Sequence, residues 1–130
     1  MGATVLIVED EILVALQLED ILSDAGHRVV GIVPDHASLR NIPDPPQVAL
    51  VDLNLRDGPT GPEIARKLSE IFGTKIVYVT ANPGQIGAPA PTAIGVIQKP
   101  FSQAGILAAV ACAIGNMAQA ELPAEIEPLS

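Results

Sequence analysis

The chain has 130 residues, 48% of them hydrophobic, and a formal net charge of −8. That length suits a single compact domain, and that apolar content argues against wholesale disorder. The acidic charge disfavours direct DNA binding, which requires clustered Lys and Arg to neutralise phosphates. The lone Cys112 offers no internal disulfide, and the longest uncharged stretch, residues 100–120, contains several polar side chains and is typical of a helix rather than a membrane span. We therefore expect a cytoplasmic protein without a membrane segment.

Alternating strand and helix patterns run along most of the chain. Short apolar runs predict buried strands over residues 4–8, 28–33, 48–51, 75–79 and 94–97. Apolar side chains at helical spacing predict helices over about residues 14–25, 62–71 and 102–119, with a weak, short helix over 36–41. Five buried strands that alternate with helical segments imply an α/β fold with a parallel sheet and right-handed crossovers.

Side chains with carboxylate, hydroxyl or ammonium groups stand at or just after the ends of four of these strands. Glu9 and Asp10 come after the first strand, Asp52 after the third, Thr80 at the end of the fourth and Lys99 close after the fifth. The carboxyl ends of parallel strands meet at one edge of a sheet, where such folds place their functional crevice. Converging carboxylates repel one another unless a cation is present, and Mg²⁺ prefers oxygen ligands. A carboxylate can attack phosphorus, while ammonium and hydroxyl groups can contact phosphoryl oxygens. The pattern therefore predicts phosphoryl transfer.

Four short motifs occur in a characteristic order and spacing: Val-Glu-Asp-Glu at 8–11, Val-Asp-Leu-Asn at 51–54, Val-Thr-Ala at 79–81 and Gln-Lys-Pro-Phe at 98–101. Together they resemble the signature of response-regulator receiver domains, and the resemblance covers roughly residues 3 to 118. It implies a flavodoxin-like (βα)5 fold, doubly wound around a five-stranded parallel sheet of order 2-1-3-4-5. It also implies a phosphorylation-dependent signalling switch of a two-component or phosphorelay system.

The resemblance assigns a role to each residue of the set. Asp52 would accept a phosphoryl group from a phosphohistidine on a sensor histidine kinase or histidine phosphotransfer protein, and Thr80 and Lys99 would contact that group. Mg²⁺ would be held by Glu9 (through water), Asp10, Asp52 and the backbone carbonyl of Asn54. Such a protein is not an enzyme but a phosphoacceptor that assists its own phosphotransfer and autodephosphorylation.

Two features depart from the family pattern. Residues 82–92 contain three Pro and two Gly, so the fourth helix is expected to be short, broken or absent. The fifth strand has Val96 where receivers usually carry an aromatic residue, so the familiar aromatic readout is missing.

The C-terminal region suggests an interface. The last predicted helix is apolar all round, and no bulky fourth helix is expected to cover it. We therefore hypothesise an exposed patch and a homodimer, or a partner dock, through the last helix and fifth strand. We place the receiver domain at 1–119 and a flexible acidic tail at 120–130. The alternative is that the tail folds back through Leu122, Ile126 and Leu129.

Other functions fit the sequence less well. A haloacid-dehalogenase-like phosphatase requires a second Asp where Asn54 stands. A pseudo-receiver, which serves as an interaction module without phosphorylation, usually lacks one of the acidic or Lys residues present here. The start and tail favour a stand-alone protein over a fragment of a longer regulator. The sequence leaves the cognate kinase, the downstream target and the phosphate lifetime open.

Overall fold

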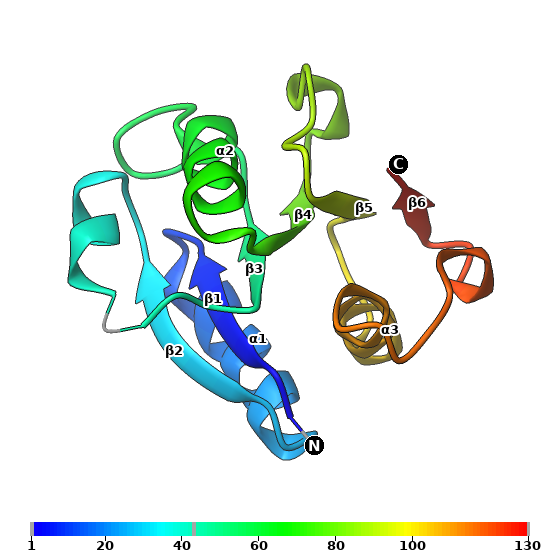
Figure 1. Ribbon diagram of the computed structural model, residues 1–130. Coiled ribbons are helices and arrows are strands. Elements are labelled where there is room, and N and C mark those ends of the chain that lie inside the picture. The colour runs from blue at the N-terminus through cyan, green and yellow to red at the C-terminus, as the bar shows by residue number, and fades with distance from the viewer. Residues whose placement is uncertain (1, 43, 130) are drawn as a thin grey trace.

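A computed structural model describes residues 2–42 and 44–129, which form one six-stranded sheet covered by helices on both faces (Figure 1). The strands are β1 (Thr4–Val8), β2 (Arg28–Val33), β3 (Val48–Val51), β4 (Lys75–Thr80), β5 (Ala93–Gln98) and β6 (Ile126–Pro128). The helices are α1 (Ile12–Asp24), α2 (Gly61–Phe72) and α3 (Gln103–Ala113). The sheet order is β2-β1-β3-β4-β5-β6, and the first five strands are parallel. The predicted flavodoxin-like α/β fold and the order 2-1-3-4-5 are confirmed, and β6 is an addition that the sequence analysis did not predict.

The sheet separates two apolar cores. On one face, α1 and α3 lie side by side and pack Leu18, Leu22 and Ile106 against β1 and β4. On the other face, α2 packs Ile64 and Leu68 against the central strands. All four residues of β3 are buried because helices cover both sides of it. Burying an aliphatic side chain stabilises the fold by about 1.5–3 kcal/mol, so these two cores hold the strand ends in place.

The α3 helix ends earlier than the sequence indicated. Its last residue is Ala113, whereas apolar spacing predicted a helix that continued to 119. Gly115 adopts φ +84°, a left-handed conformation that few residues other than glycine reach easily. The N–H groups of Gly115 and Asn116 donate back to the carbonyl groups of Cys112 and Ala111, which closes the helix.

No α-helix stands between β4 and β5, which confirms the expected loss of the fourth helix. The described residues of this loop contain only a three-residue 3₁₀ turn, Pro83–Gln85. Tyr78 on β4 is fully buried, and its hydroxyl accepts a hydrogen bond from the N–H of Ala90 at 2.9 Å. The loop is thus tied to the sheet by a side chain instead of by helical packing. A second short 3₁₀ helix, Ala37–Asn41, matches the weak helix predicted there.

The C-terminal segment is ordered where a flexible tail was expected. β6 pairs with β5 in the antiparallel direction, and Ile126 is only 3% exposed in the core beneath α3. Leu122 packs against the same core, and Leu129 packs against the core on the other face. The fold-back alternative is therefore the one observed. It is favoured because it buries apolar surface of these residues against the cores.

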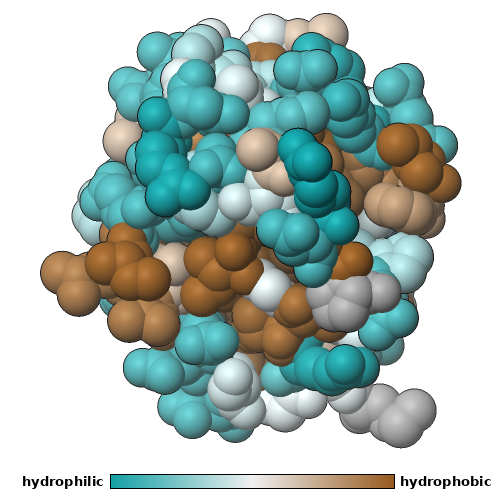
Figure 2. All heavy atoms as spheres, turned by 90° about the vertical axis from the view of Figure 1, so that its left-hand side faces the viewer, coloured by the Kyte–Doolittle hydropathy of each residue, from teal (hydrophilic) through white to brown (hydrophobic). Residues whose placement is uncertain are grey.

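The exposed patch expected on α3 and β5 is also absent from the described residues, since β6 covers that edge. The large exposed apolar side chains lie instead on α1 and at the end of α2: Ile12, Leu13, Leu16, Ile71 and Phe72. β2 forms the opposite edge of the sheet, and its residues 29–32 are only half-buried. Apolar atoms gather in a band across the middle of the face that this edge presents (Figure 2). Among the described residues, none of the helices combines the length and apolar character needed to cross a bilayer.

Candidate functional site

The predicted site residues meet at the carboxyl edge of the sheet. The N–H of Asp52 donates to the carbonyl of Val8 at 2.9 Å, and the N–H of Lys99 donates to the carbonyl of Thr80 at the same distance. These bonds tie the ends of β1 and β3, and of β4 and β5, to one another. Asp52 and Thr80 are buried, so the strands fix their position.

Three carboxylates converge at this edge. One oxygen each from Glu9, Asp10 and Asp52 lie within 4.8 Å of one another. Glu9 is 2% exposed, while Asp10 is open to solvent. A cluster of hard oxygen donors with one open side fits a divalent cation such as Mg²⁺, which keeps several water ligands. The donor set is therefore suited to the predicted metal.

Lys99 lies between two of these carboxylates. Its Nζ donates to Glu9 Oε1 at 2.7 Å and to Asp52 Oδ2 at 3.1 Å. Burial raises the pKa of the Glu9 carboxyl, although the Lys99 ammonium acts to lower it. Burial acts to lower the pKa of Lys99, but its hydrogen bonds to the two carboxylates outweigh that effect and raise it. Lys99 therefore stays charged and can balance negative charge at the site.

The remaining oxygens of the site are held by short local bonds. Asp52 Oδ1 accepts from the N–H of Leu53 at 2.7 Å, and Thr80 Oγ1 accepts from the N–H of Asn82 at 3.0 Å. The Thr80 hydroxyl is thus placed at the strand end with its own proton available to donate. Asn54 is exposed and donates through Nδ2 to Gln85 Oε1 at 2.8 Å. Asn54 therefore connects the rim of the site to the loop between β4 and β5.

Two residues of this site were missed by sequence reasoning. Gln85 lies in a Pro- and Gly-rich loop, where nothing in the sequence indicates a contact with Asn54. Gly61 begins α2 beneath Asp52, and a Cβ atom there would lie 2.0 Å from the Asp52 carbonyl oxygen. The Gly-Pro pair at 61–62 signals a helix start, but only the structure shows that no side chain fits.

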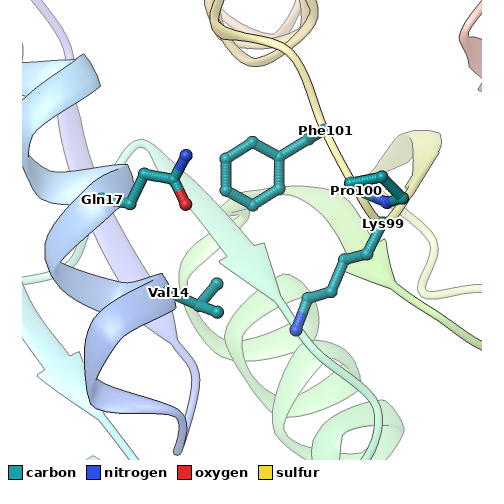
Figure 3. Close-up of a pocket in the computed structure, with 5 residues that line it drawn as sticks. All are labelled: Val14, Gln17, Lys99, Pro100 and Phe101. Atoms are coloured by element: carbon teal, nitrogen blue, oxygen red, sulfur yellow. The ribbon is translucent and has the colours of Figure 1, made fainter.

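A hollow of about 320 Å³ opens beside Lys99, between α1 and the segment after β5 (Figure 3). Val14 and Gln17 line it from α1, and Phe101 points toward them from the opposite side. The Lys99–Pro100 bond in its wall is cis. Ile12, Leu13 and Leu16, which are exposed apolar residues, lie on the same helix as Val14 and Gln17.

Known proteins resemble this arrangement. The family model of the response regulator receiver domain matches residues 5–111. The phyllosphere-induced regulator PhyR of Methylorubrum extorquens is 30% identical over 118 residues, which are 88% of this chain and 44% of that protein. The chain thus spans less than half the length of this relative.

Solved structures show the same fold. The receiver domain of the response regulator PhyR from Erythrobacter litoralis superimposes with a TM-score of 0.78 at 28% identity, covering 87% of this chain and 90% of that one. A CheY-like receiver domain protein from Methanospirillum hungatei gives a TM-score of 0.68 at 26% identity, covering 82% and 89% of the two chains.

Proposed function

Since the chain belongs to the response regulator receiver domain family, we propose that it is a phosphorylation switch whose phosphoacceptor is Asp52. The phosphodonor is a phosphohistidine on a sensor histidine kinase or a histidine phosphotransfer protein. The observation that carries the proposal is the position of Asp52, which is buried at a strand end, 3.1 Å from the Lys99 ammonium and beside two further carboxylates.

The residues can divide the chemistry among themselves. A carboxylate oxygen of Asp52 forms the new O–P bond while the P–N bond of the phosphohistidine breaks, and the electron pair of that bond stays on the imidazole, which is then protonated. The Lys99 ammonium and the Thr80 hydroxyl then hydrogen-bond the phosphoryl oxygens. Mg²⁺ would be held by Glu9, Asp10, Asp52 and the backbone carbonyl of Asn54, and when bound it neutralises charge on the phosphoryl group.

The same groups limit what the protein does. It assists its own phosphorylation and dephosphorylation, but it does not turn over an external substrate, so it acts as a signalling protein and not as an enzyme. The donor has to approach beside Lys99, where the hollow and the exposed side chains of Leu13 and Leu16 on α1 offer apolar contact area. Apolar surface next to a charged reaction centre suits a transient protein partner.

Intact-protein mass spectrometry after incubation with acetyl phosphate tests the proposal. We expect one added phosphoryl group that requires Mg²⁺ and is lost in Asp52→Asn. Asp57→Asn is the matched control, because Asp57 lies in an exposed loop where it accepts hydrogen bonds from Thr60 and His36. An adduct that persists in Asp52→Asn, or no adduct under any condition, would contradict the proposal and favour an interaction module that works without phosphorylation.

A further inference from the structure

We infer that Gln85 is a positioning residue for the magnesium site. Through its hydrogen bond to Asn54 it holds the peptide whose carbonyl is a proposed Mg²⁺ ligand, so the loop between β4 and β5 helps to set the affinity for the cation. This role rests on the proposed function and extends it to a residue that does not itself bind the metal.

Asn54 is less firmly held than the residues on either side of it. Leu53 and Leu55 are buried, and the carbonyl of Leu53 accepts from the N–H of Gly61 at 3.1 Å. Asn54 is exposed, and its N–H and carbonyl form no hydrogen bond with another residue that the structure describes. The peptide that joins Asn54 to Leu55 is held on one side, where the N–H of Leu55 donates to the carbonyl of Gly58 at 2.9 Å. A peptide plane held by one bond can still tilt about it, so the direction of the Asn54 carbonyl depends on a second restraint.

The side chain of Asn54 supplies that restraint. Its Nδ2 donates to Gln85 Oε1 at 2.8 Å, which links the loop after β3 to the loop after β4. A hydrogen bond between two exposed side chains is usually worth little, because each group exchanges a bond to water for it. This bond can restrain Asn54 only if its other partner is itself fixed in place.

Gln85 is anchored from both sides. Before it, the N–H of Asn82 donates to Thr80 Oγ1 and the N–H of Gln85 donates to the carbonyl of Asn82, both at 3.0 Å. After it, Ile86 is 8% exposed and packs into the core that α2 covers. The segment 82–86 therefore begins at a residue of the site and ends in the core, which gives Gln85 a defined position without a fourth helix.

The coupling between Gln85 and the metal works in both directions. If the contact with Asn54 tightens Mg²⁺ binding by a given factor, bound Mg²⁺ strengthens the contact by the same factor. The described residues of this loop form only a short 3₁₀ turn, so few backbone hydrogen bonds protect it. We therefore expect Mg²⁺ to slow hydrogen exchange of the backbone amides of residues 85–90 in the wild type and to have less effect on them in Gln85→Met.

Thermal denaturation of the full chain over a series of MgCl₂ concentrations gives the Kd for Mg²⁺ and tests the inference. Gln85→Met keeps the length of the side chain and removes the acceptor. We expect it to bind Mg²⁺ about three- to tenfold more weakly than the wild type, the effect of one lost side-chain hydrogen bond. Gln85→Glu keeps the acceptor and should bind at least as tightly as the wild type. Gln103→Met is the matched control and should leave the Kd unchanged, because Gln103 is exposed at the start of α3.

A second background shows whether Gln85 acts through Asn54. Asn54→Ala removes the side chain and keeps the backbone carbonyl, so it should weaken Mg²⁺ binding about as much as Gln85→Met, and combining the two substitutions should add nothing. A Kd for Gln85→Met equal to that of the control, or a loss that recurs in full in the Asn54→Ala background, would overturn the inference. Hydrogen exchange in the wild-type loop that Mg²⁺ leaves unchanged would also overturn it.

Asp10→Asn separates the positioning role from the proposed function, because Asp10 belongs to the carboxylate cluster itself. A response to Mg²⁺ that Asp10→Asn removes and Gln85→Met leaves intact would overturn the positioning role alone. A wild type that does not respond to Mg²⁺, or a response that Asp10→Asn does not change, would contradict the metal site and the positioning role with it.

Discussion

Replacing Lys99 by Met tests the electrostatic core of the site. The substitution keeps the length of the side chain and removes its charge, so Glu9 and Asp52 lose the ammonium that lies 2.7 and 3.1 Å from their oxygens. Removing one partner of a buried ion pair costs about 3–5 kcal/mol. Lys99 retains 15% exposure, and Glu9 can escape part of the penalty by taking up a proton, so we expect a loss of about 3 kcal/mol in unfolding free energy, at the low end of that range. For a domain of this size that corresponds to a fall in Tm of about 10 °C.

Urea denaturation in EDTA, followed by circular dichroism, measures this loss. Lys75→Met is the matched control, because Lys75 is exposed at the start of β4, and it should change stability by less than about 0.5 kcal/mol. Repeating the titration in Mg²⁺ should restore part of the loss, since a divalent cation satisfies the same carboxylates. If Lys99→Met in EDTA is as stable as the control, the two ion pairs do not hold the carboxylates together and the reasoning fails.

Three further perturbations address the metal, acid stability and the entry to α2. Mg²⁺ at about 100 times its Kd should stabilise the wild type by about 2.7 kcal/mol in thermal denaturation, and Asp10→Asn should remove most of that gain. Hydrogen bonds, foremost from Ser38, lower the pKa of Asp35 from 3.8 to about 2. The contribution of Asp35 to stability is therefore complete above pH 4 and lost as the pH falls toward 2, so urea titrations of Asp35→Asn should show a weaker pH dependence in that window than the wild type. Gly61→Ala should lower the unfolding free energy by about 1–3 kcal/mol and slow phosphorylation by acetyl phosphate. Gly84→Ala, where a Cβ atom meets nothing within 4 Å, should do neither. Equal stabilities of the two variants would refute the steric argument.

The sequence was sufficient for the five parallel strands and for the residues at their carboxyl edge, because both depend on local patterns. Each strand is a short apolar run, and the carboxyl ends of neighbouring parallel strands must meet, so Asp52 and Lys99 are brought together by topology alone. The loss of the fourth helix was equally readable, since Pro and Gly act through the backbone of their own segment.

What the sequence could not indicate depends on contacts between distant residues. Ile126 lies among charged and proline residues, so the sequence offered its fold-back only as an alternative to a flexible tail. The space that Gly95 leaves for Ile126 beside β5 is visible only in the structure. The close contact between Gly61 and the Asp52 carbonyl and the hydrogen bond between Asn54 and Gln85 could not be predicted either. Each is a contact between segments that no local sequence pattern connects. The expected apolar patch on α3 was wrong for the same reason, because its cover comes from the far end of the chain.

Tyr78, whose hydroxyl accepts the hydrogen bond from Ala90, also provides a spectroscopic probe that needs no label. Tyr78 is the only tyrosine, and the chain contains no tryptophan, so near-ultraviolet absorption and emission arise almost entirely at one point of β4. That point lies two residues before Thr80 and holds the loop that replaces the fourth helix. Burial raises the pKa of the Tyr78 phenol, because the charged form is disfavoured away from water. A change in Tyr78 absorbance or emission on adding Mg²⁺ or acetyl phosphate would therefore show that events at the carboxylate cluster reach the loop.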